Sequence, residues 1–186
     1  SYGVTTSQEI TAVGDRFVGP GLHIVQGVAL RGDEFRDERF GTAGLVHLAM
    51  PGRIDVARPE RSSLLLSGER ETPTAEFLVP AGLRALSLEA GLAVLSETAV
   101  HASARTDHDS RLGLVHDLQA AGAPRVLAAL WPLPDPDTAR FMAAFYDHLA
   151  ENSDVVEALV QTRRSVLASE KDGNFRNWAG FQLFIR

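Results

Sequence analysis

The segment GLAVLSETAV, residues 91–100, places Ser96, Glu97 and Thr98 at the end of an apolar run. The run from Leu92 to Ser96 is predicted to be a buried strand, because it is apolar on both faces. In an α/β enzyme the carboxyl end of such a strand commonly holds a nucleophile. A serine at the end of a strand more often forms a turn by bonding the local backbone. A turn-forming role is therefore favoured for Ser96.

Histidines are the bases that a reactive serine would require within about 3 Å. His47 lies in the apolar segment of residues 43–49, and His101 lies shortly after Thr98, so either one could serve Ser96. A histidine in an apolar strand more often belongs to the core, where hydrogen bonds satisfy its ring. That structural role is favoured for His47.

Two further groups of polar residues could bind a ligand or move a proton. A metal site would require four loop residues to converge: His101, Asp107, His108 and Asp109. No pair among them has the i, i+4 spacing of a helical zinc motif, so a solvated loop is favoured and no metal or other cofactor is expected. Glu97 and Asp55 could act as an acid and base pair, but that chemistry depends on their separation in the fold.

Composition excludes several kinds of function. The chain has no cysteine, which rules out disulfides, thiolate metal sites and thiol catalysis. Its net charge of −6 disfavours binding to nucleic acid or to a membrane of anionic lipid. The apolar runs are shorter than the roughly 20 residues of a spanning helix, and no leader-like segment opens the chain. A cytoplasmic protein is expected, and the first residue, Ser1, suggests a piece of a longer polypeptide.

The order of the apolar segments predicts one domain, residues 1–186, in which strands alternate with helices. Strands are expected at residues 22–28, 43–49, 92–96, 126–131 and 178–185, with a further apolar run at 62–68. Helices are expected at residues 32–40 and 110–121, and after the capping residues Asp135 and Ser153. A short strand and a short helix are expected around Pro80, and a short edge strand with turns at residues 1–21.

This alternation is typical of an open, mostly parallel sheet of about six strands with helices on both faces. Such sheets bind ligands beyond the carboxyl ends of their strands. The segments at that edge are residues 50–55, 96–107 and 132–137.

Several sequence segments resemble, in the same order, those of one family. LVHLAMPG is similar to "vHlAtHG", SSLLLSG to "S-x-LLL", VLSETA to "vLSaCeT" and NWAGFQLF to "WAaFvL". AAGAPRVLAALWPLPDPDTARFMAAFYDHL resembles a longer stretch without a gap. From about Leu22 to Ile185 the chain is thus similar to CHAT domains, caspase-like peptidase domains often found after tetratricopeptide repeats. The resemblance implies a caspase-like three-layer sandwich.

The same resemblance implies a catalytic dyad of a loop histidine and a cysteine, and neither residue is present. The position of the histidine falls on Pro51. The cysteine is either deleted between Ser96 and Glu97 or replaced near Thr98. Because one position is proline and the other segment looks shortened, natural degeneration is favoured over a single inactivating substitution. The expected protein is a pseudo-peptidase without an intact catalytic residue.

The favoured function is a protein-binding, scaffolding or regulatory module whose partner is a protein or peptide, with an upstream repeat region of the same polypeptide as one candidate. The expected peptide groove is lined by Met50, Gly52, Arg53, Ser96, Glu97, Trp131 and Asp135. Purely structural roles are favoured for Trp131 and Asp135. Two alternatives remain: a hydrolase that uses Ser96 with His47 or His101, and a domain that only stabilises a larger assembly.

Overall fold

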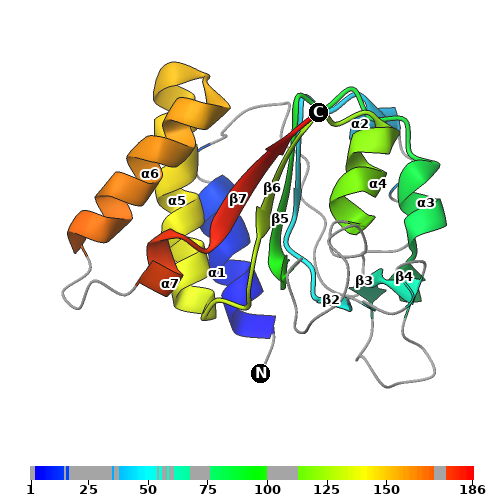
Figure 1. Ribbon diagram of the computed structural model, residues 1–186, viewed down its shortest axis with the longest axis horizontal. Coiled ribbons are helices and arrows are strands. Elements are labelled where there is room, and N and C mark those ends of the chain that lie inside the picture. Colours follow the sequence, from blue (N-terminus) through cyan, green and yellow to red (C-terminus); the bar gives the residue numbers. More distant parts are fainter. Residues whose placement is uncertain are drawn as a thin grey trace.

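The part of the chain that the structure describes forms two β-sheets flanked by helices (Figure 1). The structure is a computed structural model and describes residues 3–14, 16, 35, 38–53, 55, 58, 61–67, 76–99, 113–169 and 175–186. The expected strand at residues 22–28, most of the expected helix at 32–40 and the loop from His101 to Asp109 lie outside these residues.

The central sheet has four described strands in the order β1, β5, β6, β7. They are β1 (Leu45–Leu48), β5 (Leu92–Ala99), β6 (Arg125–Ala129) and β7 (Phe181–Ile185). Strands β1, β5 and β6 run parallel, and β7 runs antiparallel to β6. The expected α/β class with a mostly parallel sheet is confirmed, although the described part of this sheet has fewer strands than expected.

A second, antiparallel sheet lies beside the central one. Its strands are β2 (Gly52–Arg53), β3 (Ser63–Ser67) and β4 (Glu76–Leu78), in that order. The helix α3 (Pro80–Arg84) follows β4 directly, with Pro80 in its first turn. The short strand and helix expected around Pro80 are therefore confirmed, and residues 63–67 of the expected apolar run form β3 of this small sheet.

Helices cover both faces of the central sheet (Figure 1). One face carries α1 (Gly3–Gly14), α5 (Asp135–Asn152), α6 (Val155–Ser169) and α7 (Phe175–Trp178). The other side carries α2 (Glu38–Gly41), α3 and α4 (Gly113–Ala121). Alternate residues of β5 supply the two cores: Leu92 and Val94 pack toward α5, whereas Ala93 and Leu95 pack toward the α4 side. The layers match the three-layer arrangement expected from the sequence.

The expectation of a strand and turns near the N-terminus is wrong, because residues 3–14 form α1. This helix packs along α5, and its Val13 is buried among the residues on that face of the sheet. Just after it, Arg16 binds both carboxylate oxygens of Asp147 at 2.6 and 2.9 Å. Such tertiary packing stabilises a helix whose own Thr- and Ser-rich sequence shows little helical periodicity.

The two expected capping residues are placed differently by the structure. Helix α5 begins at Asp135 itself, and Pro134 occupies the capping position, where its carbonyl accepts the N–H of Thr138 at 3.0 Å. Ser153 closes α5 in a left-handed conformation with φ 56°. Asp154 caps α6, since its Oδ1 accepts the N–H groups of Val156 and Glu157 at 2.8 and 3.1 Å. Each capping role thus moves by one residue.

The turn expected at residues 96–98 is also wrong, because β5 continues to Ala99. Leu95 pairs with Ala128 and Ala99 pairs with Ala129, so the intervening residues of β5 have no counterparts on β6. Such an irregularity redirects the side chains of the bulged strand. The polar residues Ser96, Glu97 and Thr98 therefore lie in a bulge within the sheet.

Candidate functional site

The register of the central sheet brings His47 and Ser96 to the same face. His47 of β1 pairs with Val94 of β5, and Ser96 follows two residues later on the same side of the strand. Val94 faces α5, as does Leu45 on β1, so His47 and Ser96 also point toward α1 and α5. The two residues that the sequence proposed as base and nucleophile are thus neighbours.

Four side chains meet at this point, and we call them the His47 cluster: Glu9, His47, Ser96 and Tyr146. His47 Nδ1 lies 2.7 Å from the hydroxyl oxygen of Tyr146. His47 Nε2 lies 3.1 Å from Glu9 Oε1 and 3.2 Å from Ser96 Oγ. The cluster therefore links α1, β1, β5 and α5.

The cluster lies inside the protein. Glu9 and Ser96 are each 2% exposed, and Tyr146 is fully buried. Burial raises the pKa of the Tyr146 hydroxyl well above its ordinary value, and the negative charge of Glu9 raises that pKa further. Tyr146 therefore keeps its proton at neutral pH and can donate it in a hydrogen bond.

These distances determine where the protons of His47 lie. The carboxylate of Glu9 can only accept, so Nε2 must carry a hydrogen to bond it. A neutral ring then accepts the Tyr146 O–H at Nδ1, and a charged ring donates from Nδ1 to the Tyr146 oxygen. In both arrangements Nε2 has no lone pair available for the Ser96 proton.

The geometry consequently differs from that of a serine hydrolase. There the acid bonds one ring nitrogen and the serine bonds the other, which is free to accept a proton. Here Glu9 and Ser96 share Nε2, while Tyr146 occupies Nδ1. The core role expected for His47 is present, with both ring nitrogens hydrogen-bonded.

The position at which the resemblance places a loop histidine has a backbone function. Pro51 is partly buried, and its carbonyl accepts the N–H of Leu65 at 2.9 Å, which attaches the loop to β3. Of its neighbours, Met50 is 5% exposed, and Gly52 and Arg53 form β2. Met50 is thus part of the core and presents little surface to a partner.

Trp131 and Asp135 lie at the junction of β6 and α5. Trp131 donates its indole N–H to the carbonyl of Arg176 at 3.1 Å, and its ring meets that of Phe175 edge to face, with centroids 6.1 Å apart. Trp131 therefore packs against α7. Asp135 lies in the first turn of α5, where a negative charge stabilises the helix by interacting with its dipole.

The remaining candidate pairs are only partly described. Asp55 accepts the N–H of Arg58 at 2.9 Å in a local turn, and Glu97 is partly buried in the β5 bulge, so their acid and base pairing remains a prediction. Within the described residues no three side chains of the metal-binding types come together. His101 and its neighbouring acids lie outside those residues. No helix in the described part of the chain is long and apolar enough to span a membrane.

Comparison with known proteins shows the family to which the chain belongs. The family model of the CHAT domain matches residues 4–185. The chain belongs to the CHAT domain family. This CHAT domain has the mixed α/β fold with a mostly parallel sheet that the family resemblance implied, and residues 4–14 of α1 fall within the matched range.

Two relatives are tetratricopeptide repeat proteins. The CHAT domain is 36% identical over 112 residues to tetratricopeptide repeat protein 28 of Mus musculus, and 32% identical over 112 residues to the Homo sapiens protein of the same name. Each alignment covers 60% of this chain and 4% of the relative. The chain therefore matches only a small part of the length of these relatives.

His47 and Ser96 were predicted from the sequence as candidate site residues, whereas Glu9 and Tyr146 were not. Tyr146 lies on the apolar stripe of α5. Because a buried tyrosine generally needs a hydrogen-bond partner, this position indicates that its hydroxyl bonds a polar group in the core. Glu9 gave no comparable signal, because its segment was expected to form turns. Its place becomes evident only when α1 packs against α5.

The buried Tyr146 hydroxyl predicts a pH-dependent contribution to stability. Because its pKa is higher in the folded than in the unfolded state, this contribution is present below about pH 10, where the unfolded tyrosine also keeps its proton, and is lost as the pH rises further. Below pH 10 we expect Tyr146→Phe to lower the free energy of unfolding by about 1–3 kcal/mol, because His47 loses a partner.

Urea unfolding of the wild type and of Tyr146→Phe, from neutral pH to about pH 11, checks this. The difference between their free energies of unfolding should shrink in the alkaline range. Ionisations that the two proteins share cancel in that difference. A difference in free energy of unfolding that stays constant or grows above pH 10 would contradict the expectation.

Proposed function

We propose that this CHAT domain is a catalytically inactive pseudo-peptidase that works as a protein-binding, scaffolding or regulatory module. The observation that carries the proposal is the engagement of both His47 ring nitrogens by Glu9 and Tyr146. The lack of any cysteine and the presence of Pro51 at the histidine position support it. Acyl transfer by a caspase-like site would require a thiolate and a free imidazole.

Family membership supports the binding part of the proposal. The relatives are named for tetratricopeptide repeats, and repeats of this kind stack into extended concave surfaces that bind other proteins. A protein or peptide partner therefore suits the domain, and a repeat region of the same polypeptide is one candidate. The groove at the carboxyl edge of the sheet remains part of the proposal through Gly52, Arg53 and Glu97.

One observation favours a second candidate function, a hydrolase that uses Ser96. Its Oγ lies 3.2 Å from His47 Nε2, which is within reach of proton transfer. The competing bond from Nε2 to Glu9 and the 2% exposure of Ser96 count against this role. The two functions differ in whether Ser96 can be acylated or phosphonylated.

Labelling with a serine-reactive fluorophosphonate tests this difference. We expect no attachment at Ser96, because its hydroxyl has no base and little exposure to the reagent. Intact-mass and peptide mass spectrometry would detect the adduct, and Ser96→Ala serves as the control for labelling elsewhere. A second measurement follows cleavage of a peptide library derived from a proteome, where no new termini should appear. Stoichiometric labelling of Ser96, or cleavage that Ser96→Ala abolishes, would support the hydrolase instead.

A further inference from the structure

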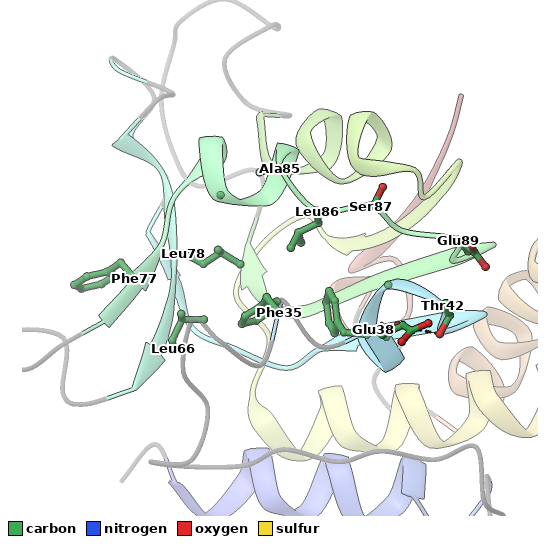
Figure 2. Close-up of a pocket in the computed structure, with 13 residues that line it drawn as sticks. Phe35, Glu38, Thr42, Leu66, Phe77, Leu78, Ala85, Leu86, Ser87 and Glu89 are labelled. Carbon is green, nitrogen blue, oxygen red and sulfur yellow. Dashed lines mark hydrogen bonds between the residues drawn. The ribbon is translucent and has the colours of Figure 1, made fainter.

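A cavity of about 590 Å³ lies on the opposite side of the central sheet from the His47 cluster. It is bounded by α2, by β3 and β4, by α3 and by the segment that leads into β5 (Figure 2). None of the expected groove residues lines it. Its volume falls within the range of about 300–1,000 Å³ that is typical of ligand pockets.

One end of the cavity is apolar. Leu66 on β3 and Leu78 on β4 are buried beside it and point into it (Figure 2). Phe35 and Phe40 also line the cavity, with ring centroids 4.9 Å apart in an edge-to-face contact. A large apolar side chain placed here would cover Leu86, which is partly buried and points into the cavity (Figure 2), and removing apolar surface from water is favourable in proportion to the area covered.

The other end of the cavity is acidic and is held by backbone hydrogen bonds. Glu38 and Glu89, both exposed, lie at this end with Thr42 (Figure 2). Glu89 N–H bonds the carbonyl of Gly41 at 2.8 Å, and Thr42 bonds the carbonyl of Glu38 through both its N–H and its hydroxyl, at 3.0 and 2.9 Å. Among described residues neither carboxylate is in an ion pair with a cationic side chain.

We propose that this cavity binds a protein segment that carries a large apolar residue and a nearby lysine or arginine. The apolar residue would lie against Leu78 and Leu86, and the cation would pair with Glu38 and Glu89. Acidic residues at one end disfavour a phosphate or another anion, since like charges repel. The proposal rests on the proposed function, because it supplies the binding module with the chemistry of its partner.

Binding of synthetic peptides tests the proposal with the whole chain. The probe is a fluorescein-labelled peptide of alternating leucine and arginine, and its counterpart has glutamate in place of arginine. Fluorescence anisotropy should show that the wild type binds the basic peptide and not the acidic one. We expect Glu38→Lys with Glu89→Lys to weaken binding by at least about tenfold, and Leu86→Ala to weaken it by about threefold or more.

Two matched controls separate the cavity from other acidic surfaces. Glu151→Lys with Glu157→Lys changes the net charge by the same amount as the double substitution in the cavity, but on α5 and α6. This control should leave binding of the basic peptide nearly unchanged. Glu97→Arg reverses a charge at the proposed groove. Melting temperatures of all variants establish that each remains folded.

Several outcomes would overturn the assignment of the cavity. These are no measurable binding by the wild type, equal binding of the two peptides, and equal weakening by the α5 and α6 control. Weakening by Glu97→Arg alone would place the peptide in the groove instead. Cleavage of the bound peptide, seen by mass spectrometry, would contradict the proposed function itself, so the two failures are distinguishable.

Discussion

Replacing His47 with alanine is expected to lower the free energy of unfolding by about 3–5 kcal/mol, the usual cost of leaving a buried charge without its partner. Glu9 is 2% exposed, and His47 Nε2 lies 3.1 Å from its carboxylate. The substitution also removes the partner of the buried Tyr146 hydroxyl. Urea unfolding at neutral pH, followed by circular dichroism, measures the change.

A double-mutant cycle shows whether the Glu9 carboxylate causes this loss. In the background of Glu9→Gln, the buried group has no charge, so His47→Ala should cost clearly less than in the wild type. His148→Ala is the matched control, because His148 on α5 is 25% exposed and pairs with the exposed Glu151. That control should change stability by about 0.5 kcal/mol or less. Equal costs of His47→Ala in both backgrounds would show that the two residues are not coupled.

A smaller cost of His47→Ala in the Glu9→Gln background would bear on function as well as on stability. If the His47 cluster stabilises the fold, its residues are held by requirements of packing and hydrogen bonding rather than by catalysis. In the proposed pseudo-peptidase, His47 would then connect α1 and α5 to the central sheet. Recognition of a partner would depend on surfaces elsewhere, such as the cavity beside Leu86.

The central layers of the fold could be predicted from the sequence, because buried parallel strands and amphipathic helices leave strong patterns. The run from Leu92 to Leu95 and the apolar stripe of α5 are such patterns. The small sheet was harder to assign, since an apolar run such as that of β3 does not specify its neighbours. The bulge after Leu95 was hidden for a similar reason, because it appears only in the pairing of β5 with β6.

The candidate site could be predicted only in part. His47 and Ser96 were named because each lies near the end of an apolar strand, and the parallel register brings them together. The bond between His47 and Tyr146 joins residues 99 positions apart, and no local pattern encodes such a contact. The hydrogen bond between Glu9 and His47 likewise depends on the position of α1. Local sequence therefore identified two residues of the cluster, and tertiary packing determined their chemistry.

Replacing Phe181 with alanine is expected to lower the free energy of unfolding by about 3–5 kcal/mol, as is usual for a fully buried phenylalanine. Phe181 begins β7, is fully buried, and stacks on Phe141 of α5 with ring centroids 4.6 Å apart. The substitution would leave a cavity between β7 and α5 that the surrounding residues fill only partly. Ile185→Ala is the matched control on the same strand, and because Ile185 is 62% exposed we expect a change of about 0.5 kcal/mol.

The same substitution should loosen the region around Trp131. Phe181 pairs with Ala129 at the end of β6, and the next N–H, that of Leu130, bonds the carbonyl of Gly180 at 2.8 Å. These contacts fix the start of the loop in which Trp131 packs against α7. We therefore expect Phe181→Ala to shift tryptophan fluorescence toward longer wavelengths before global unfolding, whereas Ile185→Ala should not. An unchanged spectrum with normal stability would show that β7 does not hold this edge of the sheet in place.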